Sequence, residues 1–373
     1  MKLTPFLIFF SIVLVIYSLI NYYIFNKGLQ FFSGFTKIYA FGFWIIVAAY
    51  PVGRVLERLY PSLLSTILIW IGAFWLGFMV YFLLFSALSD LLSLVIRVFH
   101  FPMLSPSVKQ LLFYSVLLVS TLLIVIGHFN ARFPRVKHLD LYLPVTKQVK
   151  MVMLSDVHLG TLVGPNRINY IVNRINALNP DIVVFAGDVI DEDVGPVIRQ
   201  NLGNALTGIK APLGVYAITG NHEYIGGAKS AVEYLQIHGI KVLRDTSVLI
   251  DDNFYLIGRE DRESNRFSNI VRKPLTEITK GLLPNKAKIL LDHQPFELNK
   301  AVEAGIDLSL SGHTHHGQLW PFNFITKAVF ENSFGYLKKG STQFYVSCGA
   351  GTWGPPIRTS SRAEIVELRL LPN

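Results

Sequence analysis

Two hydrophobic patterns divide the chain of 373 residues. Long apolar runs without charged residues occupy its first third, and these runs are Leu3–Asn26, Ile38–Gly53, Leu59–Ser89 and Gln110–Ala131. A membrane-spanning helix needs about 20 mostly apolar residues. Three of the runs have that length, and the second reaches it if it starts near Phe31 and the side chain of Lys37 extends to the interface. We therefore predict four transmembrane helices within residues 1–131.

The basic residues that flank these runs predict the orientation. An even number of spans places the N-terminus and the rest of the chain on one side of the membrane. That side would carry Lys2, Arg54, Arg58, Arg132, Arg135 and Lys137, and the other side would carry Lys27, Lys37, Arg97 and Lys109. Because cytoplasmic flanks carry the excess of Lys and Arg, we expect a multi-pass protein of the cell membrane with a cytoplasmic C-terminal domain. Residues 132–148, interrupted by Pro134 and Pro144, are expected to form a basic juxtamembrane linker.

After Lys150 the pattern changes to short apolar runs that alternate with amphipathic segments. The runs predict strands at Lys150–Leu154, Ile182–Ala186, Val215–Thr219, Lys288–Leu291, Leu308–Leu310, Phe344–Ser347 and Ile365–Leu370. The amphipathic segments predict helices at Pro165–Leu178, Pro196–Thr207, Ala228–His238 and Phe296–Ala304. Between Lys241 and Ile257 short strands dominate, which indicates a second sheet. We therefore predict that residues 149–373 form an α/β domain of two packed mixed sheets flanked by helices.

The net charge of +9 does not point to nucleic acid. Residues 1–131 contribute +5 and the remaining 242 residues contribute +4, so a basic margin beside membrane spans accounts for the excess. We expect no nucleic-acid partner. The single cysteine, Cys348, excludes an intrachain disulfide, and its place after an apolar run predicts a small buried side chain.

Five short polar blocks follow strand-like runs in the second pattern. They are Asp156-Val157-His158, Gly187-Asp188-Val189-Ile190-Asp191, Gly220-Asn221-His222-Glu223, Asp292-His293-Gln294-Pro295 and Gly312-His313-Thr314-His315. The ends of neighbouring strands meet at one rim of an α/β sheet, so we expect these side chains to converge there. Without cations, such a cluster of carboxylates, amide and imidazoles would be costly to desolvate.

The order of the five blocks resembles the calcineurin-like metallophosphoesterase superfamily, over about Met151–Leu370. The ending Gly349–Arg358, followed by Glu364-Ile365, looks like its membrane-attached bacterial branch, which is similar in general plan to some UDP-2,3-diacylglucosamine hydrolases. This resemblance implies a calcineurin-like phosphoesterase fold. His316 departs from the pattern because relatives in this branch often have glycine there.

The resemblance also implies roles for the site residues. It assigns Asp156, His158 and His315 to one metal ion, Asn221, His293 and His313 to a second, and Asp188 to both. It places His222 against the phosphate as an electrostatic partner or general acid, with Asp191 orienting its ring. Mixed imidazole and oxygen ligands suit Mn, Fe, Zn or Co. We expect Val157 in the core, and Glu223, Glu192 and Asp193 at the surface or in turns.

These expectations describe a membrane-anchored, binuclear metal-dependent phosphoesterase that hydrolyses a phosphate mono- or diester. Attachment to the bilayer favours a phospholipid or a nucleotide-diphospho-lipid as substrate. Two alternatives stay open: a nucleotide or cyclic-nucleotide phosphodiesterase, and a non-catalytic metal-binding sensor or scaffold. The sequence leaves the oligomeric state and the metal identity undecided.

Overall fold

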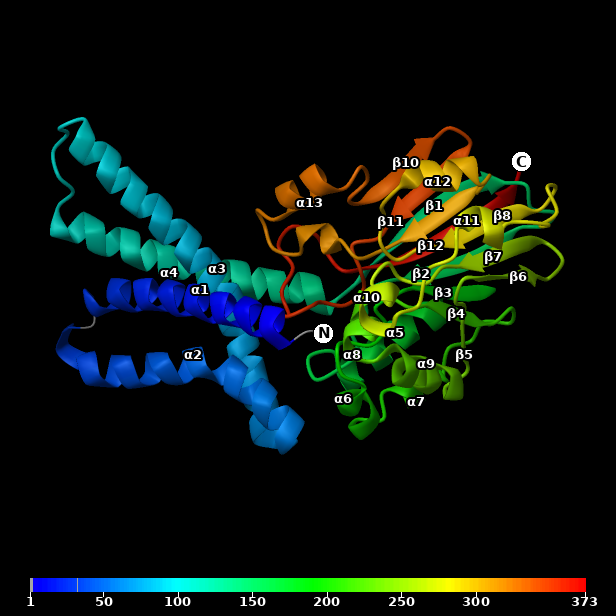
Figure 1. The fold of residues 1–373 in the computed structure, drawn as a ribbon. Helices are drawn as coiled ribbons and strands as arrows, with labels where there is room; N and C mark the ends of the chain where they lie inside the picture. The colour runs from blue at the N-terminus through cyan, green and yellow to red at the C-terminus, as the bar shows by residue number, and fades with distance from the viewer. Residues whose placement is uncertain (1–2, 32) are drawn as a thin grey trace. The chain divides into compact units, whose positions relative to one another are not determined.

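The computed structural model describes residues 3–31 and 33–373, so Lys2 of the predicted basic margin lies outside the described residues. The chain divides into two compact units. One runs to His128 and includes Gly354–Ile357, and the other contains Phe129–Trp353 and Arg358–Asn373. Figure 1 labels the elements of both units along the chain.

The first unit is helical. Its four long helices are α1 (Leu3–Leu29), α2 (Thr36–Leu59), α3 (Leu63–Val98) and α4 (Pro106–Arg132), with a short 3₁₀ turn η1 (Ser33–Phe35) before α2. Each of the four contains a segment long and apolar enough to cross a membrane. The prediction of four long apolar helices is therefore confirmed.

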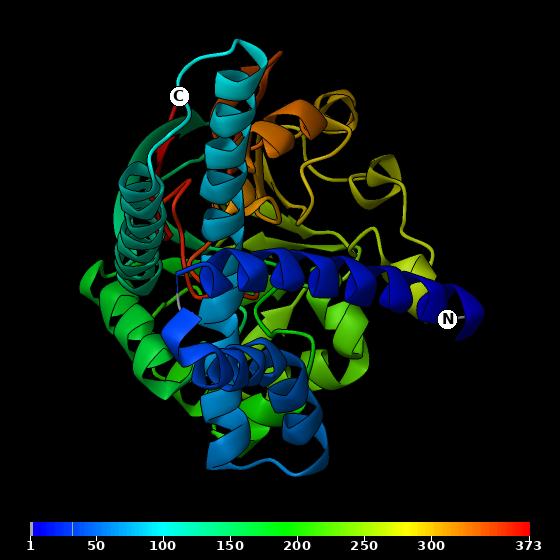
Figure 2. The same cartoon turned by 90° about the vertical axis from the view of Figure 1, so that its left-hand side faces the viewer.

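Aromatic stacking and one buried amide join these helices. Phe31 of the α1–η1 connection stacks on Phe113 of α4 with ring centroids 4.1 Å apart. α1 crosses α3 in both views of the molecule (Figures 1 and 2). At the crossing the indole N–H of Trp75 donates to Oδ1 of the fully buried Asn21 at 2.9 Å, and the Asn21 amide donates to the carbonyl of Tyr17. A buried amide with filled hydrogen bonds fixes the pairing of helices without the cost of an unsatisfied polar group.

The second unit contains two six-stranded mixed sheets. The first has the order β1-β12-β2-β3-β4-β5, with bounds Arg135–Leu143, Glu364–Pro372, Val149–Leu154, Ile182–Ala186, Val215–Ile218 and Ile240–Val242. The second has the order β10-β11-β9-β8-β7-β6, with bounds Gly335–Lys339, Thr342–Val346, Leu308–Ser311, Ala287–Leu291, Phe254–Gly258 and Thr246–Ile250. Both sheets contribute to one apolar cluster, for example through Met153 and Val184 of the first and Ile289 and Leu310 of the second. The predicted architecture of two packed mixed sheets is confirmed.

Helices cover the outer faces of the sheets. The helices that follow strands of the first sheet are α5 (Pro165–Ala177), α6 (Val194–Arg199), α7 (Gly203–Leu206), α8 (Asn221–Gly226) and α9 (Ala228–Ile237). The helices in the part of the chain that forms the second sheet are α10 (Ser264–Ser268), α11 (Leu275–Ile278), α12 (Leu298–Glu303), the turn η2 (His315–Gly317) and α13 (Asn323–Val329). α5 packs Ile168 and Ile171 against Val152 and Phe185 of the sheet. The single helix predicted at 196–207 is two short helices, α6 and α7, with Leu202 buried between them.

One segment differs from its expected role. Residues 135–143 lie within the expected linker, but they form the edge strand β1 and pair in parallel with β12 along nine residues, from Arg135 opposite Glu364 to Leu143 opposite Pro372. Leu141 and Leu143 are buried in the core. Arg135 and the charged residues that lie between Arg135 and Leu141 are exposed. The globular unit therefore includes a strand that the sequence assigned to the linker.

Candidate metal centre

The loops that follow β2 and β3 run side by side at the rim of the first sheet. The backbone N–H of Asp156 donates to the carbonyl of Gly187 at 3.1 Å, and that of His158 donates to the carbonyl of Asp188 at 3.0 Å. These bonds continue the parallel pairing of β2 and β3 beyond the strands. Asp156, His158 and Asp188 adopt left-handed backbone angles, with φ of 50°, 51° and 52°. That conformation turns their side chains toward one another at the rim.

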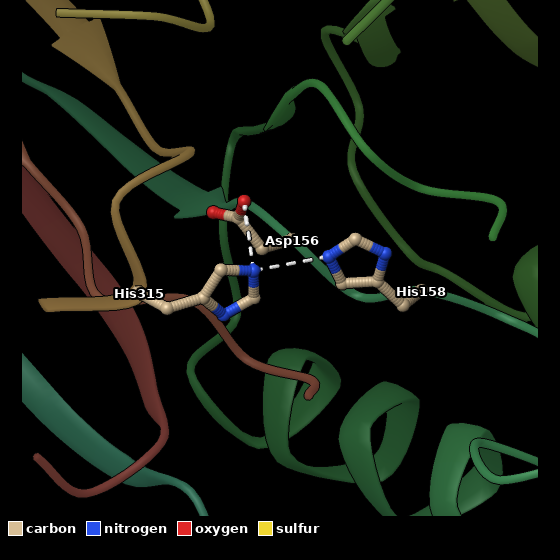
Figure 3. Close-up of side chains that lie close together, drawn as sticks. All are labelled: Asp156, His158 and His315. Carbon is tan, nitrogen blue, oxygen red and sulfur yellow. Dashed lines mark hydrogen bonds and ion pairs between the residues drawn. The ribbon is translucent and has the colours of Figure 1, made fainter. Parts of the chain in front are cut away.

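The first predicted ligand set lies together. Figure 3 shows Asp156, His158 and His315 pointing toward one another, and one ligand atom of each lies within 4.8 Å of the others. Nε2 of His315 lies 3.1 Å from Nε2 of His158 and 3.5 Å from Oδ1 of Asp156. All three side chains are buried. The arrangement offers an oxygen and two nitrogens to one point.

The second predicted set lies together as well. Oδ1 of Asn221 is 3.2 Å from Nε2 of His293 and 2.9 Å from Nδ1 of His313. Asn221 begins α8, while His293 and His313 follow β8 and β9 of the second sheet. The two sheets therefore both contribute to this set. Burial, and then the neighbouring charge of His293, lower the pKa of His313 to about 3, so its ring is neutral and can act as a ligand.

Asp188 lies between the two sets. Its Oδ2 is 3.1 Å from Nε2 of His293 and 3.9 Å from Nε2 of His158. Its other oxygen, Oδ1, accepts a hydrogen bond from the backbone N–H of His222 at 2.9 Å. Burial opposes ionisation, but His293 and then His222 hold the pKa of Asp188 well below its usual range. A single charged carboxylate is thus available to both sets.

His222 lies beside the first ligand set and forms a hydrogen bond with Asp191. Nδ1 of His222 is 3.1 Å from Oδ1 of Asp191, and the ring of His222 meets the ring of His158 edge to face, with centroids 4.5 Å apart. Burial alone would lower the pKa of His222, but Asp188 and Asp191 outweigh it and raise the pKa to about 9. Because Nδ1 is occupied by Asp191, Nε2 is the nitrogen left for other partners.

Two glycines allow the loops to approach this closely. A Cβ on Gly187, which has φ of 86°, would lie 2.5 Å from Nδ1 of His293. A Cβ on Gly312 would lie 2.3 Å from Oδ2 of Asp156. Gly187 precedes Asp188 and Gly312 precedes His313, so the glycines of these blocks make room for the ligands of the other blocks.

Glu223 corrects one expectation. The sequence suggested a surface or turn residue, but Glu223 is only 1% exposed. Its carboxylate accepts hydrogen bonds from the backbone N–H groups of Gly220, Asp188 and Ile190 at 2.7, 3.1 and 2.9 Å. It therefore binds the loop after β3 to the start of α8. The signal was in the sequence, because Glu223 stands at the third helical position where such capping carboxylates occur.

Arg358 is a second residue of the site without an assigned role in the sequence. It is fully buried, and its guanidinium donates to Nδ1 of His315 at 3.0 Å and to the carbonyl of Gly351 at 2.8 and 2.9 Å. Burial, and then the charge of Arg358, lower the pKa of His315 well below its usual range. The arginine thus keeps the ring of His315 neutral, and its hydrogen bond to Nδ1 places the ring proton on Nε2, where a bound cation would displace it.

Four further expectations concern single residues. Val157 and Cys348 are fully buried, as predicted. Burial, and then the charge of Glu364, raise the pKa of the Cys348 thiol to about 12. His316 turns its ring toward Phe334, with centroids 4.9 Å apart, and among the described residues it does not lie in a cluster of His and Asp side chains that could hold a metal ion. Asp193 is exposed and caps α6 through the backbone N–H of Gly195, so it stays a turn residue.

The residues present fit a cation. Nδ1 of His293 lies 2.8 Å from the carbonyl of Ala186, which can only accept, so Nδ1 carries a proton. Nε2 faces the oxygens of Asp188 and Asn221. Burial opposes a charged ring, but Asp188 outweighs it and raises the pKa of His293 well above its usual value, so Nε2 holds a proton that a bound cation would replace. Lone pairs that face one another in a buried site require positive charge between them. The donor set of imidazole and oxygen atoms is the one that first-row divalent metals prefer.

The amino-acid sequence of the chain is similar to those of known proteins. Residues 149–317 match the family model for calcineurin-like phosphoesterases. An uncharacterized metallophosphoesterase of Helicobacter pylori strain J99 is 36% identical over 231 residues, which are 61% of this chain and 60% of the relative. A transmembrane protein with a metallophosphoesterase domain from Bos taurus is 34% identical over 61% of this chain and 54% of its own length. The chain thus spans less than two thirds of these two relatives.

The match to one relative extends along almost the whole chain. An uncharacterized metallophosphoesterase of Campylobacter jejuni is 32% identical over 379 aligned positions, which cover 98% of both proteins. The similarity therefore includes the long apolar helices as well as the globular unit. The chain belongs to the calcineurin-like phosphoesterase family.

Proposed function

We propose that the protein is a membrane-anchored phosphoesterase with a binuclear centre, acting on a phosphate mono- or diester carried by a lipid. The observation that carries the proposal is the position of Asp188 between two convergent ligand sets, with one oxygen 3.1 Å from His293 and 3.9 Å from His158. A carboxylate in that position can bind two ions at once. One set of ligands would form a site for a single metal ion, whereas two sets that share a carboxylate support a pair of metal ions.

In this proposal the ligands of the first ion are Asp156, His158 and His315, and those of the second are Asn221, His293 and His313. Two bound divalent ions would supply a hydroxide nucleophile at neutral pH and stabilise the charge of an in-line displacement at phosphorus. Mn, Fe, Zn and Co all suit this donor set. The protein contributes the fixed geometry, because backbone hydrogen bonds between the loops after β2 and β3 hold the ligands on these loops at a set separation.

His222 is proposed as the residue that contacts the substrate phosphate. Its Nδ1 is held by Asp191, and His222 is 6% exposed. A hydrogen donated from Nε2 would stabilise the phosphoryl oxygens or protonate the leaving group. Asp191 is then a positioning residue, because it acts through His222.

Membrane anchorage is proposed from the four long apolar helices. Their lengths of 27, 24, 36 and 27 residues meet the requirement for spanning a bilayer. Residues 1–131 would form the transmembrane region and the following residues the catalytic domain, with β1 counted as part of that domain. We propose a cytoplasmic catalytic domain on the basis of the positive margin next to the spans.

A lipid substrate is favoured because attachment to the bilayer keeps the enzyme and lipid head groups in one plane. A nucleotide-diphospho-lipid agrees with one further observation. Trp353 is 53% exposed, and its ring lies edge to face with His222 at 5.7 Å. An exposed indole beside the reacting group can stack on a base or a sugar. The same feature would suit a soluble nucleotide, which keeps that substrate as the second candidate.

Metal content and soluble-substrate activity test the centre together. Purified full-length protein in detergent should retain about two transition-metal ions per chain and hydrolyse a p-nitrophenyl phosphodiester. Asp188→Asn should reduce the occupancy of both ions, because the residue is assigned to both. Asp251→Asn, at an exposed position of the same unit, is the matched control and should retain both. One ion or none in the wild type, even after Mn or Zn supplementation, would contradict the shared centre.

A further inference from the structure

An exposed apolar surface lies immediately after the histidine-rich turn of the candidate centre. We call it the apolar rim and define it as Trp320, Phe322, Phe324, Ile325 and Val329. These side chains are 42, 39, 60, 60 and 57% exposed. Three of them belong to α13, a helix without any buried residue. Phe322, Ile325 and Val329 follow helical spacing, so they lie next to one another on one face.

The apolar rim is joined to the metal centre at both ends. At its start, Gly317 lies so close to the backbone of Phe322 and Asn323 that a Cβ on it would lie 2.3 Å from the Asn323 nitrogen. Gly317 is two residues from the proposed ligand His315. At its end, the ring of Phe330 meets the ring of His313 edge to face, with centroids 6.0 Å apart. The rim therefore borders the site.

The loop that carries Trp353 is fixed to the same segment. The side chain of Gln318 donates to the carbonyl of Trp353 at 2.8 Å and accepts from its backbone N–H at 3.1 Å. The backbone N–H of Trp320 donates to Oγ1 of Thr359 at 2.9 Å. Hydrogen bonds thus connect the exposed indole beside His222 to the segment that carries the apolar rim.

The chemistry of the rim matches a bilayer interface. Between Gly317 and Phe330 the only charged residue is Lys327, which is exposed. Indole and phenyl side chains are the ones that collect at the boundary between head groups and acyl chains, and a lysine beside them attracts anionic lipid. A contiguous apolar surface of this kind on a globular unit marks an interaction site.

We propose that the apolar rim inserts into the interfacial layer of the bilayer, so that the centre beside it receives its phosphoester from a lipid head group. The inference rests on the proposed function and names the surface that delivers the substrate. A bilayer is favoured over a second copy because the same chain contains four helices of membrane-spanning length, so lipid is always within reach of the globular unit. The positive charge of Lys327 would attract anionic lipid and would repel the same lysine in a second copy of the chain.

Site-directed spin labelling can measure the depth of the rim. The full-length protein, in a Cys348→Ser background, would carry a nitroxide at Ile325→Cys and be reconstituted in nanodiscs of phosphatidylethanolamine and phosphatidylglycerol. The matched control is Ile237→Cys, an isoleucine at the end of α9 that is 77% exposed. Molecular oxygen, which concentrates in the bilayer, should relax the label at 325 more than a water-soluble nickel chelate does. The order should be reversed at 237.

Two results would overturn the proposal. One is a label at 325 that is as accessible to the nickel chelate as the control label. The other is spin–spin broadening at 325 that disappears when unlabelled protein is added, since this would identify a second copy of the chain as the occupant. The depth does not depend on turnover or on bound metal. A failed metal or hydrolysis assay would therefore count against the proposed function alone, and a water-exposed rim would count against this inference alone.

Discussion

His222 and Asp191 form the one pair of the site that the proposed ligand sets do not include. His222→Ala should leave the metal content near that of the wild type and reduce turnover by roughly 10²–10⁴, the usual contribution of a positioned acid or base. Asp191→Asn should reduce turnover less, because Asp191 acts through the ring of His222 and lies 3.6 Å from Nδ1 of His158, and does not contact the substrate itself. Elemental analysis and the p-nitrophenyl phosphodiester assay measure the two quantities on the same sample.

The control for this pair is His138→Ala, an exposed histidine of β1 that pairs with Glu367. It should leave both quantities unchanged. Loss of metal from the His222→Ala protein would mean that His222 is a ligand, and the division between ligands and the phosphate-contacting residue would then be wrong.

Glu223 predicts a change in stability. Its carboxylate accepts three backbone hydrogen bonds, and in Glu223→Gln one of its oxygens becomes an amide that can only donate. A buried backbone donor left without its acceptor costs about 1–3 kcal/mol, which corresponds to roughly 2–12 °C in the unfolding midpoint of a domain of this size. The midpoint should fall by that amount, whereas Glu233→Gln, at an exposed position on α9, should leave it unchanged. An equal midpoint for both variants would show that the three bonds do not stabilise the loops.

The proposed metal ligands could be predicted from the sequence, whereas the residues that hold the loops and the ligands in place could not. The proposed ligands stand in short blocks at strand ends, where the residue types alone indicate a cation. Glu223 and Arg358 act on backbone groups and on one ring nitrogen, and their role depends on where loops far apart in the chain meet. A buried carboxylate that caps a helix and a surface carboxylate are the same letter in the sequence. Only the folded loops distinguish them.

At the level of elements, β1 decides where the globular domain begins. A fragment that starts at Arg132 retains β1 and should be soluble and active on the p-nitrophenyl phosphodiester. A fragment that starts at Val149 lacks β1 and exposes β12 along nine residues, so it should aggregate or unfold at a lower temperature. Size-exclusion chromatography and thermal unfolding of the two fragments check this. A monomeric and equally stable fragment from Val149 would show that β1 is dispensable.

The strands that the sequence predicted are those buried along most of their length. β3, for example, is buried at all five positions and reads as one apolar run. β1 was missed because an edge strand exposes charged residues such as Lys137 and Asp140, and these, with the flanking prolines, resemble a linker. α13 was missed because it has only seven residues and buries none of them. In the globular unit, the hydrophobic pattern thus did not reveal α13, a short helix, or β1, an edge strand with few buried residues.

For the whole molecule, the side of the membrane can be tested in intact cells. Protease added outside cells that express the protein should spare the globular domain if the domain is cytoplasmic, and should degrade it once the cells are permeabilised. Immunoblotting of a C-terminal tag gives the readout. Degradation in intact cells would place the domain outside the cytoplasm and would exclude any substrate confined to it.

The left-handed backbone of the metal centre has a consequence for how much protein a cell contains. Five proposed ligands, Asp156, His158, Asp188, His313 and His315, have φ between 47° and 71°. Each such residue opposes folding by about 1–2 kcal/mol, so together they oppose it by an amount comparable to the total stability of about 5–15 kcal/mol of a typical domain. Bound metal would offset this cost, by about 4 kcal/mol at a concentration 1,000 times its dissociation constant. Metal scarcity would then lower the abundance of the enzyme through degradation of unfolded chains, in addition to leaving the remaining molecules inactive.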